Sequence, residues 1–289
     1  MGEVVIGGEA LAKGLVTRND LRHHYRRLFP GVYVRGEPTL RDRTVGAWLW
    51  SGRRGVLAGV AASALHGSAW VDPDVPIELI WRNGRPPAGL IVRNETLAAD
   101  EVMRVAGLPV TTPARTAFDL ARHLPRDEAV ARIDALAWTR RVTVDDVAAL
   151  IERYPAARGI RAARAVLRLV DAGADSPRET WLRLRLTDAG LPPDSTQIPV
   201  VDERGRIVAI LDMGWERHLV AVNYDGVFHQ SDRKRYVRDL KTLRALEDRG
   251  WIVIRVVAED DIADVITRVR RALLRRGWRR DCSEGQIPA

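Results

Sequence analysis

Acidic residues stand at the ends of apolar runs in the last third of the chain. One such run, Ile207 to Leu211, is followed directly by Asp212. Apolar residues at successive positions predict a strand that is covered on both faces. A carboxylate at the end of such a strand is costly unless it is hydrogen-bonded or bound to a metal ion. Asp212 is therefore the main candidate for a catalytic or metal-binding carboxylate, and a structural hydrogen bond is the alternative.

A second carboxylate, Glu179, stands at the start of a predicted helix. In the order Ser176-Pro177-Arg178-Glu179, the serine and the glutamate form a capping box, in which each side chain bonds to the other's backbone N–H. Glu179 also lies three residues before Leu182 and seven before Leu186, so it shares the helix face that those leucines turn toward the core. We therefore expect Glu179 to cap the helix, to serve a site, or to do both.

The segment VNYDG, residues 222–226, ends the next apolar run, and His229 follows it. Asn223 can offer a cation a neutral carbonyl oxygen but no charge. Asp225 and His229 are groups that can transfer protons.

The spacing of the two strands predicts how far Asn223 lies from Asp212. In a regular hairpin that turned at residues 214–218, Asn223 would face about residue 208. It would then lie about 13 Å from Asp212 along the sheet, at ~3.3 Å per residue. The two side chains would meet only if the strands bend.

Over residues 176–257 the predicted order is helix, strand, strand, helix, strand, and the motifs in that order are SPRE, LDM, YDG, a following His and WIVIRV. This segment resembles the metal-dependent nucleases with a PD-(D/E)XK core, particularly the very-short-patch-repair-like endonucleases. The resemblance implies a mixed sheet flanked by helices.

The same resemblance implies a Mg²⁺ or Mn²⁺ ion held by Asp212, Glu179 and Asn223. A metal-bound water would attack the phosphodiester, and Asp225 or His229 would assist proton transfer. The family has Glu at the position of Asn223, and the Lys of the general pattern is replaced by Asp225. Because hard cations gain affinity from charged oxygen ligands, the absence of the glutamate predicts weak metal binding.

Two helices predicted near the C-terminus are rich in basic residues. Seven arginines and no acidic residue occur between Arg268 and Arg280, together with Trp278. Such helices can follow a phosphate backbone, although a solvated helix face is the alternative. In the helix predicted over residues 231–249, the candidate nucleic-acid-binding residues are Arg233, Lys234, Arg235 and Arg238.

Residues 1–38 predict a small DNA-binding module. Thr17 is a good N-cap for one helix, and residues 28–35 predict a hairpin that turns at Pro30-Gly31. A helix followed by a hairpin ending in GVYV resembles the winged-helix start of abortive-infection (AbiEi-type) antitoxins. Arg18 and Arg22 would touch phosphates, but only one helix fits before the hairpin, so the module is expected to be truncated and to bind without sequence preference. A structural cap is the alternative.

Residues 39–172 predict an α/β region followed by helices. The segments ALHG and TTPARTAFDLA loosely resemble the antitoxin family and contain no recognisable chemistry, and His66 is expected to be a packing residue. Thr112 and Pro113 predict a helix start with an apolar stripe. Predicted helices cover residues 40–67 around the breaker Ser51-Gly52, 127–139, 143–152 and 159–170. Predicted strands cover 76–82 and 89–93 on either side of the turn NGRPP, as in a hairpin, and 173–177 predict a linker.

Composition and charge restrict the classes of function. The chain has 289 residues, with 46 Lys plus Arg against 38 Asp plus Glu and a net charge of +8. The excess of arginine favours an anionic partner such as DNA. The single Cys282 excludes a disulfide framework or a thiolate zinc site. An N-terminus without signal-peptide features, and the lack of an apolar run of about 20 residues, predict a cytoplasmic protein without membrane contact.

The sequence therefore predicts an α/β protein whose C-terminal domain has a restriction-endonuclease-like mixed sheet. It predicts a nucleic-acid-binding protein with a metal-dependent DNA endonuclease site that has partly degraded. The alternative is a non-enzymatic DNA-binding regulator or antitoxin of a type IV toxin–antitoxin system, with a cognate toxin as partner. The expected domains are a truncated winged-helix-like module at 1–38, an antitoxin-like region at 39–172, a nuclease-like domain at 176–280 and a tail at 281–289.

Overall fold

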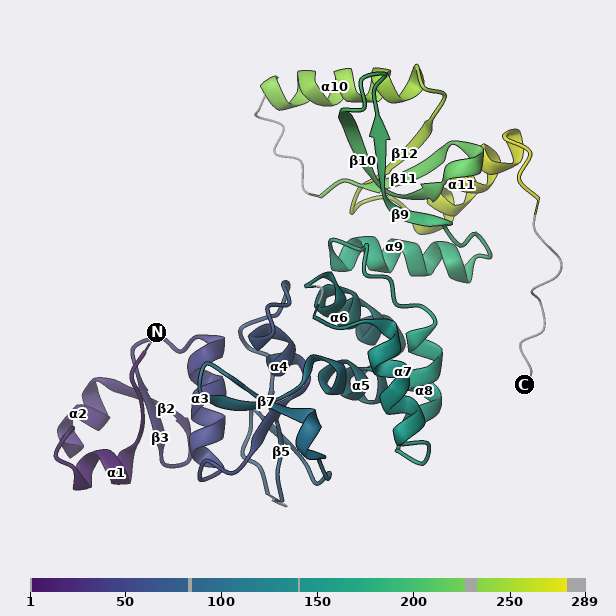
Figure 1. The fold of residues 1–289 in the computed structure, drawn as a ribbon. Coiled ribbons are helices and arrows are strands. Elements are labelled where there is room, and N and C mark those ends of the chain that lie inside the picture. Colours follow the sequence, from purple (N-terminus) through teal and green to yellow (C-terminus); the bar gives the residue numbers. More distant parts are fainter. Residues whose placement is uncertain (1, 83–84, 140, 227–232, 280–289) are drawn as a thin grey trace. The chain divides into compact units, whose positions relative to one another are not determined.

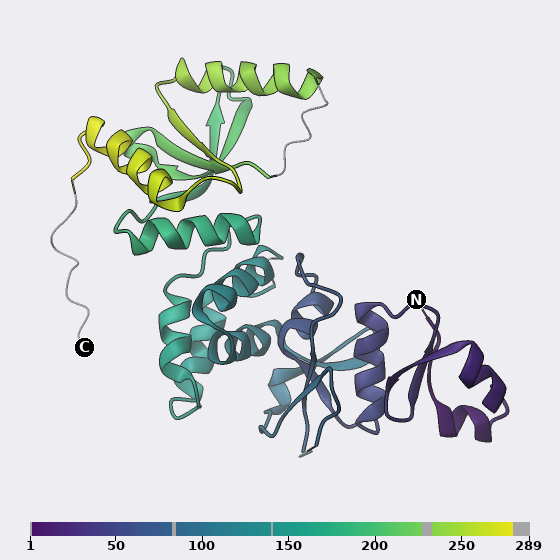
Figure 2. The same ribbon diagram turned by 180° about the vertical axis from the view of Figure 1, so that it is seen from behind.

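The computed structural model describes residues 2–82, 85–139, 141–226 and 233–279, with the backbone alone for 233–239. The chain divides into two compact units, residues 1–172 and 173–289 (Figure 1; Figure 2 shows the reverse side). The division falls at the start of the predicted linker. Both units contain sheets and helices, which confirms the α/β class. None of the described helices is long and apolar enough to cross a membrane.

The N-terminal module contains two helices before its hairpin, so the prediction of a single helix was wrong. The additional helix, α1, begins at Gly7 without a side-chain cap, and therefore lacks the usual sequence signal. Gly7 is required there because an added Cβ would lie 2.7 Å from the Tyr33 ring. The elements are β1 (Val4–Ile6), α1 (Gly7–Ala12), α2 (Arg18–His23), β2 (Tyr25–Phe29) and β3 (Val32–Arg35), in a sheet of order β1-β3-β2.

A five-stranded sheet follows, with the order β6-β5-β4-β8-β7. Two expectations fail here. The segment at 56–58 is a strand rather than part of a helix, and β5 and β6 are parallel rather than a hairpin. Buried Leu57 holds β4 between β5 and β8. The elements are α3 (Leu40–Trp50), β4 (Val56–Ala58), α4 (Gly59–Leu65), β5 (Ile77–Ile80), β6 (Leu90–Arg93), η1 (Ala99–Glu101), β7 (Val102–Val105) and β8 (Leu108–Thr111).

Four helices complete the first unit, and the sequence predicted each of them. Thr112 accepts a hydrogen bond from the Arg115 backbone N–H, and Pro113 occupies the first helical position, as the local signal predicts. The first of these helices packs against the other three (Figure 1). They are α5 (Pro113–His123), α6 (Arg126–Trp138), α7 (Val144–Arg153) and α8 (Ile160–Leu167).

The second unit is a mixed four-stranded sheet with helices on both faces (Figure 1). Helices α9 and α11 cover one face, and α10 covers the other. Parallel strands β11 and β12 are joined through α10. The elements are α9 (Pro177–Asp188), β9 (Ser195–Val201), β10 (Ile207–Trp215), η2 (Glu216–His218), β11 (Val220–Tyr224), α10 (Arg233–Glu247), β12 (Ile252–Val256) and α11 (Ile262–Arg275), with strand order β12-β11-β10-β9. The sequence did not predict β9.

Candidate functional site

Strands β10 and β11 place Asp212 next to Asn223, as the nuclease resemblance implies. A regular hairpin turning at residues 214–218, which would have separated them by about 13 Å at ~3.3 Å per residue, does not form. Met213 pairs with Val222, and the same register continues to Trp215 and Val220. The strand therefore runs further than expected and reverses only through η2 and Leu219. Trp215 keeps the strand extended because its ring is fully buried and its Nε1–H donates to the Pro192 carbonyl at 2.8 Å.

Side-chain oxygens join the two strands where this register ends. The Asp212 backbone N–H donates to Oδ1 of Asn223 at 3.2 Å, and the Tyr224 N–H donates to Oδ2 of Asp212 at 2.6 Å. Asp212 and Asn223 thus bond each to the backbone of the other's strand. This arrangement supports the structural alternative for both residues, because backbone amides require such partners.

Half of the predicted capping box forms at Glu179, which also influences Asp212. Its backbone N–H donates to the Ser176 hydroxyl at 3.2 Å, while its carboxylate accepts from that hydroxyl at 2.9 Å, from the Asp175 N–H at 3.0 Å and from Gln197 Nε2 at 3.2 Å. Burial raises the pKa of Glu179. Burial, followed by the nearby charge of Glu179, raises the pKa of Asp212 from 3.8 to about 7. Glu179 and Asp212 therefore form an acid pair.

Among the described residues, Asp225 is not free to join this acid pair. Asp225 forms an ion pair with Arg255, and its N–H donates to the Val256 carbonyl at 2.8 Å. His229 lies outside the described residues, as do the side chains of the four basic residues predicted on α10, namely Arg233, Lys234, Arg235 and Arg238.

The acid pair does not fit a divalent ion with its present ligands. Within the described ranges, no group of three His, Cys, Asp or Glu residues is placed to hold a metal. Asn223 adds a neutral oxygen that already accepts the Asp212 N–H. Two carboxylates whose pKa values are both raised, with no third charged ligand, are a poor site for a hard cation.

Helix α2 presents basic side chains on the surface of the first unit. Thr17 and Asp20 form a full capping box, and no residue of the helix is buried. Arg18 and Arg22 are both exposed, and no salt bridge joins either to a carboxylate of the described residues. On the hairpin, Arg26 pairs with Glu37 and Arg27 is exposed. The predicted phosphate contacts, Arg18 and Arg22, are therefore accessible.

The sequence did not predict a buried ionic cluster on α5. Arg115 is 2% exposed and bonds through Nε to both oxygens of Asp119 at 3.1 Å, through Nη2 to Glu95 at 2.7 Å, and through Nη1 to Glu101. Arg122 bonds through Nη2 to Glu95 at 2.7 Å and to Asp119 at 2.6 Å. The only sequence signal was the i,i+4 and i,i+3 spacing of these charges, which also describes an ordinary solvated helix face.

The hydrogen bonds of this cluster and burial have opposite effects on the pKa of Glu95. Burial alone would raise it, but the hydrogen bonds from His123 and Arg122, together with their charges, lower it to about 2. His66, also in this unit, is buried and its Nε2 lies 2.7 Å from the Thr111 carbonyl oxygen. A packing role for His66 agrees with that contact.

Comparisons with known proteins support the antitoxin part of the sequence prediction. Residues 55–169 match the family model of the AbiEi antitoxin C-terminal domain. Two uncharacterized proteins of Mycobacterium tuberculosis, from strains CDC 1551 / Oshkosh and ATCC 25618 / H37Rv, are each 29% identical over 242 residues, which cover 81% of this chain and 86% of the relative. No solved structure matches the chain. The segment from β4 to α8 is thus similar to an antitoxin domain, and no match supports the nuclease part.

Proposed function

We propose that this protein is a DNA-binding regulator of the antitoxin type, which contacts DNA through its N-terminal module. The observation that carries the proposal is the arrangement of α2, a capped helix that is wholly on the surface and presents Arg18 and Arg22. It follows α1 after a short turn and precedes a hairpin, the order of a helix-turn-helix with a wing. The match of residues 55–169 to an antitoxin domain supports the same function.

The geometry of α2 supports contact by its N-terminal end. Arg18 and Arg22 are four residues apart and lie on one helix face, and Asn19 is exposed beside them. Asparagine and arginine are the side chains that read adenine and guanine in the major groove. Since two helices precede the hairpin, the reason for expecting sequence-independent binding no longer holds. We expect a preferred DNA site.

The test is a titration of the full-length protein against a duplex selected by the wild type from a random library. Each phosphate that a variant no longer neutralises should reduce the slope of log affinity against log salt by about 0.9, so Arg18→Ala with Arg22→Ala should reduce it by about two units. Arg161→Ala, which removes an exposed arginine of α8, is the matched control and should leave the slope unchanged. An unchanged slope in the double variant would show that α2 does not touch the DNA backbone.

The antitoxin similarity also implies a cognate toxin as a protein partner. A metal-dependent nuclease is the second candidate function, favoured by the contact of Asp212 with Asn223 and by the charge of Glu179 near Asp212. Because these residues do not fit a metal ion as they stand, DNA binding without cleavage is the primary proposal.

A further inference from the structure

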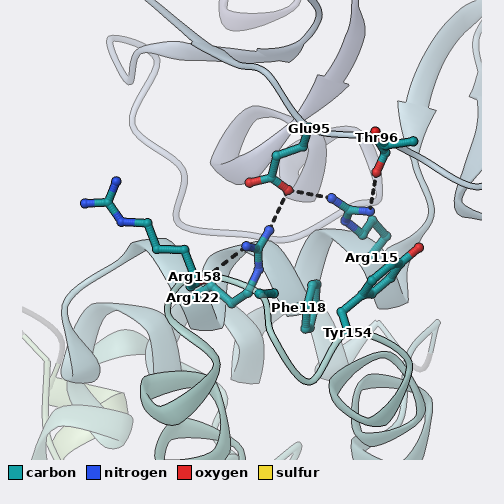
Figure 3. Close-up of a pocket in the computed structure, with 8 residues that line it drawn as sticks. Glu95, Thr96, Arg115, Phe118, Arg122, Tyr154 and Arg158 are labelled. Carbon is teal, nitrogen blue, oxygen red and sulfur yellow. Dashed lines mark hydrogen bonds and ion pairs between the residues drawn. The ribbon is translucent and has the colours of Figure 1, made fainter.

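A pocket of about 330 Å³ lies beside the ionic cluster of α5 (Figure 3). Its walls come from the loop after β6, from α5 and from the segment that follows α7. Such a volume is at the lower end of the range for small-molecule sites. The lining residues are Glu95, Thr96, Arg115, Phe118, Arg122, Tyr154, Ala157 and Arg158.

The charges that line this pocket are mainly positive. Three of the lining residues are arginines, and Glu95 is the one acidic residue among them. Glu101 and Asp119, which also neutralise Arg115, do not line the pocket and are each 2% exposed. A ligand in the pocket would therefore meet more positive than negative side chains directly.

Two of the arginines offer hydrogen-bond donors to a ligand. Nε of Arg122 is buried and has no hydrogen-bond partner among the described residues. Leaving such a donor unsatisfied is costly. Because the atom is closed to solvent in this arrangement, a ligand acceptor would reach it only after a neighbouring group such as Glu95 moves aside. Arg158 is exposed, and its side chain extends away from the other lining residues in Figure 3. It is free to turn toward a ligand at the entrance.

Glu95 holds the position that an anionic ligand would compete for. Its Oε2 accepts from both Arg115 and Arg122 at 2.7 Å (Figure 3). Two guanidinium groups around one carboxylate form the arrangement that binds carboxylate and phosphate groups elsewhere. Glu95 lies in an irregular segment, whereas both arginines are fixed on α5. The glutamate can therefore leave more easily than the arginines can move.

We infer that this pocket binds a small oxyanion, either a phosphate or a carboxylate, that carries a compact apolar group. The oxyanion would be bound by Arg122 and Arg158 in competition with Glu95, and the apolar group would contact Tyr154 and Ala157. This site is separate from α2 and does not depend on the DNA-binding proposal.

The test uses isothermal titration of the full-length protein with four probes, namely inorganic phosphate, phenyl phosphate, benzoate and benzylamine. The wild type should bind at least one of the two aromatic anions and should not bind benzylamine. Tighter binding of phenyl phosphate identifies a phosphate ligand, and tighter binding of benzoate identifies a carboxylate ligand. Binding of benzylamine in preference to the anions, or of no probe at millimolar concentration, would overturn the inference.

Three variants locate the site. Glu95→Gln removes the competing charge and should tighten anion binding about tenfold, because like charges at short range repel strongly. Arg158→Gln changes only an exposed residue, so it should fold, and should weaken binding about fivefold because one charge-assisted hydrogen bond is removed. Arg161→Gln is the control and should have no effect. Equal affinities for wild type and Arg158→Gln, together with no gain in Glu95→Gln, would place any binding elsewhere.

Discussion

The pKa values of buried carboxylates are shifted in opposite directions in the two units. In the first unit burial alone would raise the pKa of Glu95 and Glu101, but hydrogen bonds from His123 and Arg122 lower that of Glu95. Hydrogen bonds from Tyr154 and Arg115 lower that of Glu101 in the same way. In the second unit, no cationic side chain of the described residues pairs with Glu179 or Asp212, and the pKa of each is raised. The comparison shows that the partner, rather than the depth of burial, decides the direction. The first group is organised as an ionic network with its own cations, and the second as an acid pair without a cationic partner among the described residues.

Removing the central cation of the ionic cluster should have the largest effect. Arg115→Met leaves Asp119, Glu101 and Glu95 without their shared partner, and breaking a buried ion pair in this way costs about 3–5 kcal/mol. The free energy of unfolding of the first unit, measured by hydrogen exchange of α5 in urea, checks this. Arg53→Ala removes an exposed ion pair with Glu9 and should cost less than about 1 kcal/mol. Equal costs for the two variants would show that the cluster has no special role.

Removing the charge of Asp212 should increase the free energy of unfolding, whereas removing that of Arg115 decreases it. The pKa of Asp212 is raised in the folded state, so its contribution to stability is present at pH below its unfolded value of 3.8 and is lost as the pH rises toward about 7. Asp212→Asn keeps an oxygen for the Tyr224 N–H and removes the charge. It should therefore stabilise the second unit by about 4 kcal/mol at pH 8 relative to its effect at pH 4.

Thermal unfolding of the wild type and Asp212→Asn across this pH range measures the difference. A stabilisation that does not change with pH would mean that Asp212 is already neutral in solution, or that its pKa is unshifted.

Adding a third carboxylate should turn the acid pair into a metal site. In Asn223→Glu, three carboxylates would converge, and Mn²⁺ at ten times its Kd should stabilise the protein by about 1.4 kcal/mol. Mn²⁺ is preferred to Mg²⁺ because it binds more tightly to such ligands. Binding of Mn²⁺ to Asn223→Glu is measured by calorimetry. The wild type and the double variant that combines Asn223→Glu with Asp212→Ala are the controls. No gain in Mn²⁺ binding would mean that Asp212 and Glu179 are structural.

Local signals allowed the prediction of much of the fold. The caps at Thr17, Thr112 and Ser176 and the turn at Pro30-Gly31 depend on neighbouring residues, and all of them are present. Helix α1 and strand β9 have no such signal and were missed. The parallel pairing of β5 and β6 depends on contacts that are distant in sequence, and no local pattern specifies them.

The sites were predictable only in part, for a related reason. Asp212 and Glu179 could be recognised because polar residues among apolar ones are conspicuous. Their distance from Asn223 could not, because the burial of Trp215 decides where β10 ends. The charges of the α5 cluster had the spacing of a solvated face, and only the packing of loop residue Glu95 against them shows that they are buried.

One titration tests most directly whether α2, rather than the acid pair, contacts DNA. Two double variants of the full-length protein are compared with the wild type for their affinity for the selected duplex, at one salt concentration. The α2 variant combines Arg18→Ala and Arg22→Ala, and the acid-pair variant combines Glu179→Gln and Asp212→Asn. The α2 variant should bind at least about tenfold more weakly than the wild type, as expected when two arginines no longer reach the DNA. The acid-pair variant should bind like the wild type. Weakened binding in the acid-pair variant, with the α2 variant unaffected, would contradict the proposed function.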